Sequence, residues 1–291
     1  MPSATARRPA EPRSHYHHAP YIAQRIHAEK VVLLGWNAAI LVQFAHPLVA
    51  AGLTDHSTFL THPERRPQRL SQTLDAMLAL TFGDEAAVLG AARRINTIHD
   101  GVHGVLPESV GIFPVRTPYS AHDPELLRWV HATMLDVMPR AYELYVGPLS
   151  AAERDTYCAD ASEIAPLLGI PDNYLPDSTR SLERYFYAMF ASGAIAVGRQ
   201  ARILAHEILN PILPVALQPL RPLLELPAIG LLPPYVRQAY GLQWPEGDER
   251  RLRAVAFLTR ALVRITPAVL RQWPLARRAA GPPAGRCPLA S

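Results

Sequence analysis

The chain has 291 residues, 49% of them hydrophobic, which is enough for one large domain whose core can enclose a sizeable ligand. Its 29 Lys and Arg against 25 Asp and Glu give a net charge of +4, and the arginines are scattered, which argues against a nucleic-acid-binding stripe. Cys158 and Cys287 belong to no Cys-x-x-Cys or Cys-x-x-Cys-His pattern, so a zinc ribbon, an iron–sulfur site and a covalently attached haem are all unsupported. Such sparse cysteine use fits a cytoplasmic protein.

The two ends of the chain differ in composition from its middle. We expect a disordered tail over residues 1–20, a helical domain over 21–273 and a flexible tail over 274–291. The Arg7-Arg8 pair has no apolar stretch behind it, so a secretory signal is not expected.

One apolar segment, residues 31–53, is long enough to raise the question of a membrane span. It is interrupted by Asn37, Gln43 and His46, and a proline follows the histidine. These features favour a buried helix that breaks near Pro47 over a span.

Apolar spacing predicts helices almost throughout and no strand of period two. Side-chain caps at Asp84, Asp123 and Ser150 mark three helix starts. Residues 104–121 form a long connection, and seven prolines between 211 and 234 indicate an irregular crossing. The expected helices cover residues 21–45, 47–52, 67–83, 84–102, 123–138, 150–169, 179–209 (one helix or two) and 249–265.

A histidine, His99, lies on the apolar face of the fourth of these helices, with Val88, Ala92, Ile95 and Val102. A buried polar group without a partner costs roughly 1 to 3 kcal/mol, so His99 is expected to be hydrogen-bonded in the core or to bind a ligand. The next long helix places His131 on one face with Leu127, Met134 and Met138, and for His131 and His46 a hydrogen-bonded core histidine is the simpler interpretation.

Two kinds of site are compatible with His99. His99 and His103 are four residues apart and could share one side of a helix as ligands of a bare metal ion. The pair His99-Asp100 resembles the adjacent His-Asp pair of the HD-type metal-dependent phosphohydrolases. Such a centre needs further acids, and the inward faces of these helices are poor in them.

A porphyrin makes other demands: one neutral imidazole, an apolar slot, small residues close to the ring, and a cation or hydroxyl for the propionates. Gly101 and Gly104 follow the histidine, and Arg69 with Thr73 supply a cation and a hydroxyl on the preceding helix. A surface ion pair of Arg69 with Glu64 or Asp84 is the alternative for that arginine. The residues therefore suit haem better than a bare metal.

Several ordered motifs resemble the DUF2236 family, which includes the fungal MpaB-type oxygenases and the bacterial latex-clearing (rubber) oxygenases. The resemblance spans residues 25–265. The motifs are Gln43-Phe44-Ala45-His46-Pro47-Leu48-Val49-Ala50-Ala51-Gly52, Asp55-His56-Ser57, Arg69-Leu70-Ser71-Gln72-Thr73, His99-Asp100-Gly101-Val102-His103-Gly104, Asp123-Pro124-Glu125-Leu126-Leu127-Arg128-Trp129-Val130-His131-Ala132-Thr133, Leu232-Pro233-Pro234 and Tyr240-Gly241-Leu242.

This resemblance implies an all-α domain with a globin-like core around a non-covalent b-type haem. His99 would be the proximal iron ligand, and Arg69 and Thr73 would contact or shape the haem site. Rubber-cleaving relatives carry a lysine three residues after the arginine, where this chain has Gln72. Since glutamine is a poor iron ligand, the distal side is open, holds water, or involves Gln72, His46 or His131.

The function that follows is a haem b-dependent oxygenase acting on a small apolar or aromatic molecule, with dioxygen or peroxide as oxidant. Two alternatives remain: a haem-binding carrier or sensor without turnover, and the metal-dependent hydrolase. The sequence leaves the substrate, the oxidant and the oligomeric state open.

Overall fold

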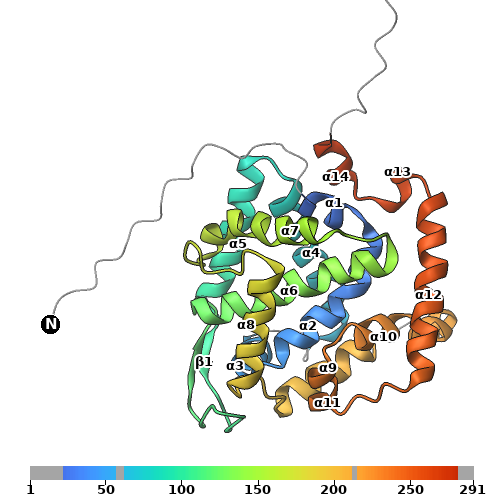
Figure 1. The fold of residues 1–291 in the computed structure, drawn as a ribbon. Helices are drawn as coiled ribbons and strands as arrows, with labels where there is room; N and C mark the ends of the chain where they lie inside the picture. The colour runs from blue at the N-terminus through green and yellow to red at the C-terminus, as the bar shows by residue number, and fades with distance from the viewer. Residues whose placement is uncertain (1–21, 57–61, 212–214, 281–291) are drawn as a thin grey trace, which may run out of the picture.

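The computed structural model describes residues 22–56, 62–211 and 215–280, and in these ranges the chain is almost entirely helical (Figure 1). The expected tail over residues 1–20 and most of the carboxyl-terminal tail lie outside the described residues. Short 3-10 helices cover Lys30–Gly35, Pro63–Arg65, Ala165–Leu168 and Val215–Leu220. The other elements are α1 (Ile22–Ala28), α2 (Trp36–Phe44), α3 (Pro47–His56), α4 (Arg66–Phe82), α5 (Glu85–Asp100), β1 (His103–Val105), β2 (Pro118–Ser120), α6 (Pro124–Tyr145), α7 (Ala151–Ile164), α8 (Thr179–Ala191), α9 (Arg199–Leu209), α10 (Arg221–Gly230), α11 (Pro234–Tyr240), α12 (Glu246–Ile265), α13 (Ala268–Arg271) and α14 (Pro274–Ala279).

Helix α6 runs through the middle of the molecule, as Figure 1 shows. It starts as the sequence predicts, since the Asp123 side chain accepts a hydrogen bond from the Glu125 amide and Pro124 takes the first helical position. Its Trp129 and Met138 are fully buried, and it packs on α2 and on the turn that ends at Gly35. Because α6 touches most of the core, its side chains can reach both sides of the fold.

The α2–α3 segment contains the predicted break. The axis turns by 106° between the helical stretch Lys30–Phe44 and α3, at the His46-Pro47 step. Within the described residues no single helix combines the length and apolarity needed to cross a bilayer, and only this bent pair meets the criterion by length and composition. Most of α2 is buried inside the protein.

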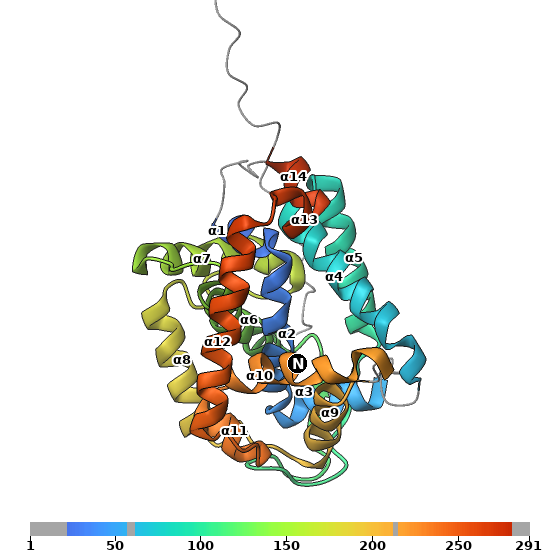
Figure 2. The ribbon, with the colours of Figure 1, turned by 90° about the vertical axis from the view of Figure 1, so that its right-hand side faces the viewer.

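Helices α4 and α5 form an antiparallel hairpin, which Figure 2 shows along one side of the molecule. Asp84 caps α5 as predicted, by accepting a hydrogen bond from the Ala87 amide. Near the turn, Phe82 packs with Ala28 of α1 and Ala276 of α14, and farther along α5 the Asn96 amide donates to the Leu167 carbonyl at 2.9 Å. The closed end of the hairpin is thus the end that is held against α1 and α14.

The connection after α5 holds a small sheet that the sequence does not predict. Strands β1 and β2 pair antiparallel, with Gly104 opposite Tyr119. The prediction that His103 extends the helical face of His99 is wrong, because α5 ends at Asp100 and His103 opens β1. Because α5 ends at Asp100, Val102 does not lie on the helical face of His99 either.

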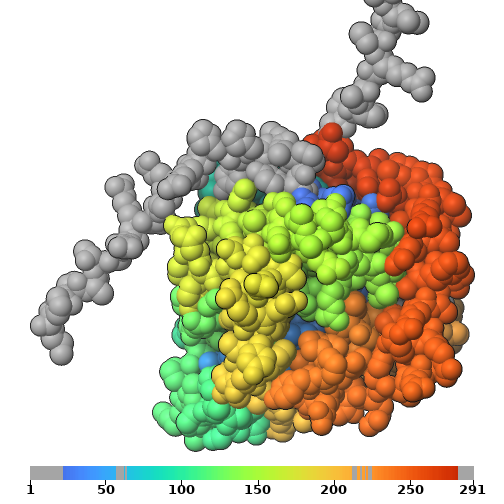
Figure 3. Space-filling view, in the orientation of Figure 1, coloured from blue at the N-terminus to red at the C-terminus, as the bar shows by residue number. Residues whose placement is uncertain are grey.

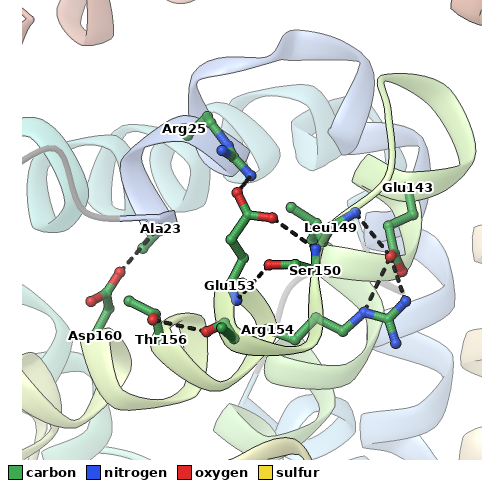
Figure 4. A network of polar contacts seen from close by, with 10 residues as sticks. Ala23, Arg25, Glu143, Leu149, Ser150, Glu153, Arg154, Thr156 and Asp160 are labelled. Atoms are coloured by element: carbon green, nitrogen blue, oxygen red, sulfur yellow. Dashed lines mark hydrogen bonds and ion pairs between the residues drawn. The ribbon is translucent and has the colours of Figure 1, made fainter.

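A polar network fixes α7 against α1 and α6 (Figure 4). The predicted capping box at Ser150 is present, and its Glu153 also forms an ion pair with Arg25 of α1 at 2.7 Å. The next residue, Arg154, pairs with Glu143 of α6 at 2.5 Å. One cap therefore joins three helices.

Residues 179–209 form two helices, α8 and α9, one of the two outcomes expected. The second half of the chain departs from expectation in two places. Residues 221–230 of the proline-rich crossing are helical, with Pro227 inside α10. Residues 274–279, expected in the tail, form α14 and pack on α4. Helix α12 begins at Glu246 and lies along the outside of the molecule, as the space-filling view of Figure 3 shows in orange-red.

Candidate functional site

The His99 imidazole is a half-buried ring near the carboxyl end of α5. Its Nδ1 is buried and has no hydrogen-bond partner in the described part of the chain. Burial lowers the pKa of His99, and the nearby His122 and His131 lower it further, while Asp100 acts in the opposite direction. The ring is therefore neutral at pH 7, which is the form that ligates a metal.

His122 is a site residue that the helical pattern does not reveal. The small sheet returns the chain so that the His122 ring lies edge-on to His99, with ring centroids 5.9 Å apart. Its Nε2 is 2.8 Å from an oxygen of Asp100, the residue after His99. In the sequence, His122 stands in the segment Ser120-Ala121-His122-Asp123 between β2 and α6. This segment indicates a site residue only when the pairing of β1 with β2 is known.

His131 lies on α6, close enough to His99 that a charge on its ring lowers the pKa of His99. Its Nδ1 is 2.9 Å from the Leu127 carbonyl oxygen, which can only accept, so Nδ1 carries the proton and Nε2 keeps a lone pair. Burial lowers the pKa of this ring, against the effect of the hydrogen bond. His131 is thus a neutral imidazole with Nε2 available as an acceptor or ligand.

Arg69, Gln72 and Thr73 lie on the amino-terminal half of α4. Arg69 is thirteen residues before Phe82 and His99 is fourteen residues after Glu85, and at 1.5 Å per residue both lie about 20 Å from the hairpin turn. The hairpin therefore brings the two residues to the same, open end.

The side chains of Arg69, Gln72 and Thr73 have no hydrogen bond or ion pair to another element within the described residues, whereas Arg66 at the start of α4 pairs with Glu207 of α9 at 2.8 Å. Thr73 Oγ1 donates to the Arg69 carbonyl at 3.0 Å, and the expected alternative ion pairs of Arg69 with Glu64 or Asp84 are not formed. Gln72 is exposed. The guanidinium of Arg69 makes no ion pair within the described residues, so its charge is not neutralised there.

Apolar side chains line the inner side of α4 from the residue after Thr73 onward. Leu74 and Met77 border a small cavity of about 20 Å³ with Trp36 and Met138. Trp36 Nε1 is buried there without a partner in the described part of the protein. The cavity is also bordered by Thr81 and Trp273, so it lies toward the closed end of the hairpin.

His46 is buried at the α2–α3 break and is not joined to the His99 group. Its ring contacts Phe113 and Trp129, with centroids 5.2 and 6.4 Å away. Burial lowers the pKa of His46 to about 4, and its Nδ1 has no partner among the described residues. The hydrogen-bonded core histidine expected here is therefore not what the structure contains.

A second polar cluster holds the small sheet on α3. The Tyr119 hydroxyl donates to Asp55 Oδ2 at 2.6 Å and lies 3.3 Å from His56 Nε2, which in turn contacts the His103 carbonyl oxygen at 2.9 Å. A side chain at Gly104 would lie 2.6 Å from that hydroxyl, so glycine is required for the close approach. The cluster anchors the segment that carries His122.

A larger cavity of about 460 Å³ opens on the other side of α6, between α6, α7, α8 and the Pro233-Pro234 step. Its two arginines are already paired, Arg140 with Asp136 and Arg154 with Glu143. Within the described residues no group of three or more His, Cys, Asp or Glu side chains is arranged to hold a metal ion. The remaining walls of the cavity are Leu135, Pro139, Cys158, Thr179, Leu182, Glu183, Phe186 and Phe190.

Comparison with known families agrees with the motifs on α4, α5 and α6. Residues 24–261 match the family described as "ER-bound oxygenase mpaB/B'/Rubber oxygenase, catalytic domain". No curated protein matches the chain significantly. No solved structure does so either. Since the match covers most of the 291 residues, the chain belongs to the family of mpaB and rubber oxygenase catalytic domains.

Proposed function

We propose that the protein is a haem b-dependent oxygenase that acts on a small apolar or aromatic molecule, with His99 as the proximal ligand of the iron. The observation that carries this proposal is the neutral His99 ring, whose buried Nδ1 has no partner, at the same end of the α4–α5 hairpin as Arg69. Haem, when bound, would supply the redox-active iron at which dioxygen or peroxide is activated.

The residues present fit such a group. Desolvation keeps His99 unprotonated, so a ring nitrogen lone pair is available. The His122 ring, whose Nε2 pairs with Asp100, packs edge-on against the His99 ring and limits its orientations. The charge of Arg69 suits the propionate carboxylates of haem, and the Thr73 hydroxyl would have to give up its hydrogen bond to the Arg69 carbonyl in order to donate to one.

The three candidates for the distal side differ in their support. His131 is electrostatically coupled to His99 and has a free Nε2 that can accept a proton or a hydrogen bond. His46 is surrounded by aromatic rings, and Gln72 is exposed on α4. We therefore infer that His131 positions a polar reactant near the iron, and that Gln72 does not take the ligand role of the lysine in rubber-cleaving relatives.

The substrate class is proposed from the oxygenase family and from the apolar side chains of α4 and α6. Leu74, Met77 and Met138 are apolar, and the cavity that they border also has His27 and Glu29 in its lining. At about 20 Å³ this cavity holds about one water molecule, so it marks an apolar strip and is not itself a substrate pocket. An apolar or aromatic molecule gains free energy from such a strip, at roughly 25 cal/mol for each Å² removed from water.

The test is oxygen transfer by the full chain loaded with haem. Incubation with a panel of apolar and aromatic compounds under ¹⁸O₂ is expected to give a product that carries the label, read by mass spectrometry. His99→Ala is expected to lose this activity, whereas the matched variant His103→Ala, on exposed β1, keeps it. Haem binding with no labelled product from any compound, and with an iron that does not bind oxygen, would favour the carrier or sensor instead.

A further inference from the structure

Helix α12 and the turn after it leave a line of large apolar side chains in water. Leu258, Leu262 and Ile265 are between 61% and 78% exposed, and their spacing of three and four residues places them on one face. The opposite face buries Leu252 and Ala256 against the body of the protein. The line also includes Phe257 and continues into α13 with Val269 and Leu270, and we call these six residues the α12 stripe.

Figure 2 looks onto the side of the molecule where α12 stands in front. Contiguous exposed apolar surface on a soluble fold marks an interaction site, whereas scattered single side chains do not. The stripe extends over two consecutive helices. We therefore expect a binding partner to cover the stripe.

The charged side chains beside the stripe are basic past the first turn of α12, which holds the acidic residues Glu246, Asp248 and Glu249. Residues 250–280 contain no Asp, Glu or Lys, and Arg250, Arg264 and Arg278 are exposed and unpaired within the described ranges. Arg250 and Arg264 lie seven residues before and after Phe257, so all three share one line along α12. The other arginines in this stretch are Arg251, Arg253, Arg260, Arg271 and Arg277.

This charge decides between two occupants. A second copy docked symmetrically on the stripe would bring two sets of arginines together, and two of the three carboxylates of α12 already pair within their own chain, Asp248 with Arg251 and Glu249 with Arg253. An anionic lipid surface offers phosphate groups to the arginines and acyl chains to the apolar side chains. A helix with an apolar face flanked by arginines lies in such an interface.

We propose that the α12 stripe docks the protein on the surface of a membrane that contains anionic phospholipid, with α12 lying parallel to that surface. The apolar side chains enter the boundary between headgroups and acyl chains, while Arg250 and Arg264 contact phosphates. This attachment is peripheral and does not depend on haem or on oxygenase activity.

Sedimentation of the full chain with lipid vesicles tests the proposal. The wild type is expected to bind vesicles of phosphatidylcholine mixed with phosphatidylglycerol far better than vesicles of phosphatidylcholine alone. Arg250→Gln and Arg264→Gln are each expected to weaken binding roughly fivefold. The double variant Leu262→Ser, Ile265→Ser is expected to weaken it at least about tenfold.

Matched variants on α8, Arg180→Gln and Tyr187→Ser, change the same side-chain types elsewhere on the surface and are expected to bind as the wild type does. Circular dichroism checks that each variant is folded. Absence of binding to the anionic vesicles overturns the proposal, as does binding that the α12 variants leave unchanged. A dimer in solution that Leu262→Ser, Ile265→Ser dissociates, without vesicle binding by the wild type, identifies a second copy as the occupant and also overturns it.

Discussion

Removal of the Tyr119 hydroxyl tests how the segment carrying His122 is anchored. Tyr119 is 5% exposed, and its hydroxyl donates to the Asp55 carboxylate at 2.6 Å. A hydrogen bond to a charged group contributes about 1.5 to 3 kcal/mol. Asp55 is on the exposed end of α3 and can regain water, so Tyr119→Phe is expected to lower the free energy of unfolding by about 1.5 kcal/mol, at the low end of that range.

Urea unfolding followed by circular dichroism measures this change, and the Tm is expected to fall by roughly 3 to 5 °C. Tyr187→Phe is the matched control, because the Tyr187 side chain is 78% exposed and its hydroxyl has no partner in the described residues. Equal stabilities of the two variants would refute the idea that the Tyr119–Asp55 hydrogen bond holds the sheet on α3.

Two further predictions concern protonation and close packing. Burial lowers the pKa of His46 from 6.5 to about 4, so as the pH falls through 6.5 the unfolded chain binds a proton on this ring and the folded chain does not. The free energy of unfolding is therefore expected to decrease between pH 6.5 and 4, by up to about 3 kcal/mol. Unfolding at several pH values should show this loss, and His46→Gln should flatten the curve; an unchanged slope contradicts the burial argument. Gly35→Ala would place a Cβ 2.7 Å from the Ala141 Cβ and is expected to destabilise by about 1 to 3 kcal/mol in urea unfolding. Gly147→Ala has open space and should be nearly neutral, so similar effects of the two variants would contradict the packing of α6 on this turn.

Helix starts could be predicted because their signals are local. Asp84, Asp123 and Ser150 each accept a hydrogen bond from an amide two or three residues ahead, so the sequence pattern and the structure describe the same contact. The break at Pro47 was predictable for the same reason, since proline lacks the amide hydrogen that the preceding helix needs. These features required no knowledge of distant residues.

The small sheet and the environment of His99 depend on distant residues and could not be predicted in this way. A three-residue strand is too short to show a period of two, and the Tyr119–Asp55 contact spans 64 residues. The apolar spacing continues past Gly101 to His103 although α5 ends at Asp100, and it does not indicate the contact of His122 with His99. The motif resemblance identified the family, whereas the partners of His99 required the fold.

Haem binding by His99 is tested most directly by a haem titration of the purified full chain. We expect the wild type to bind one haem with a sharp Soret band, and we expect His99→Ala to lose that band and most of its affinity, while His103→Ala keeps both. An unchanged Soret band and full haem occupancy in His99→Ala would contradict the account.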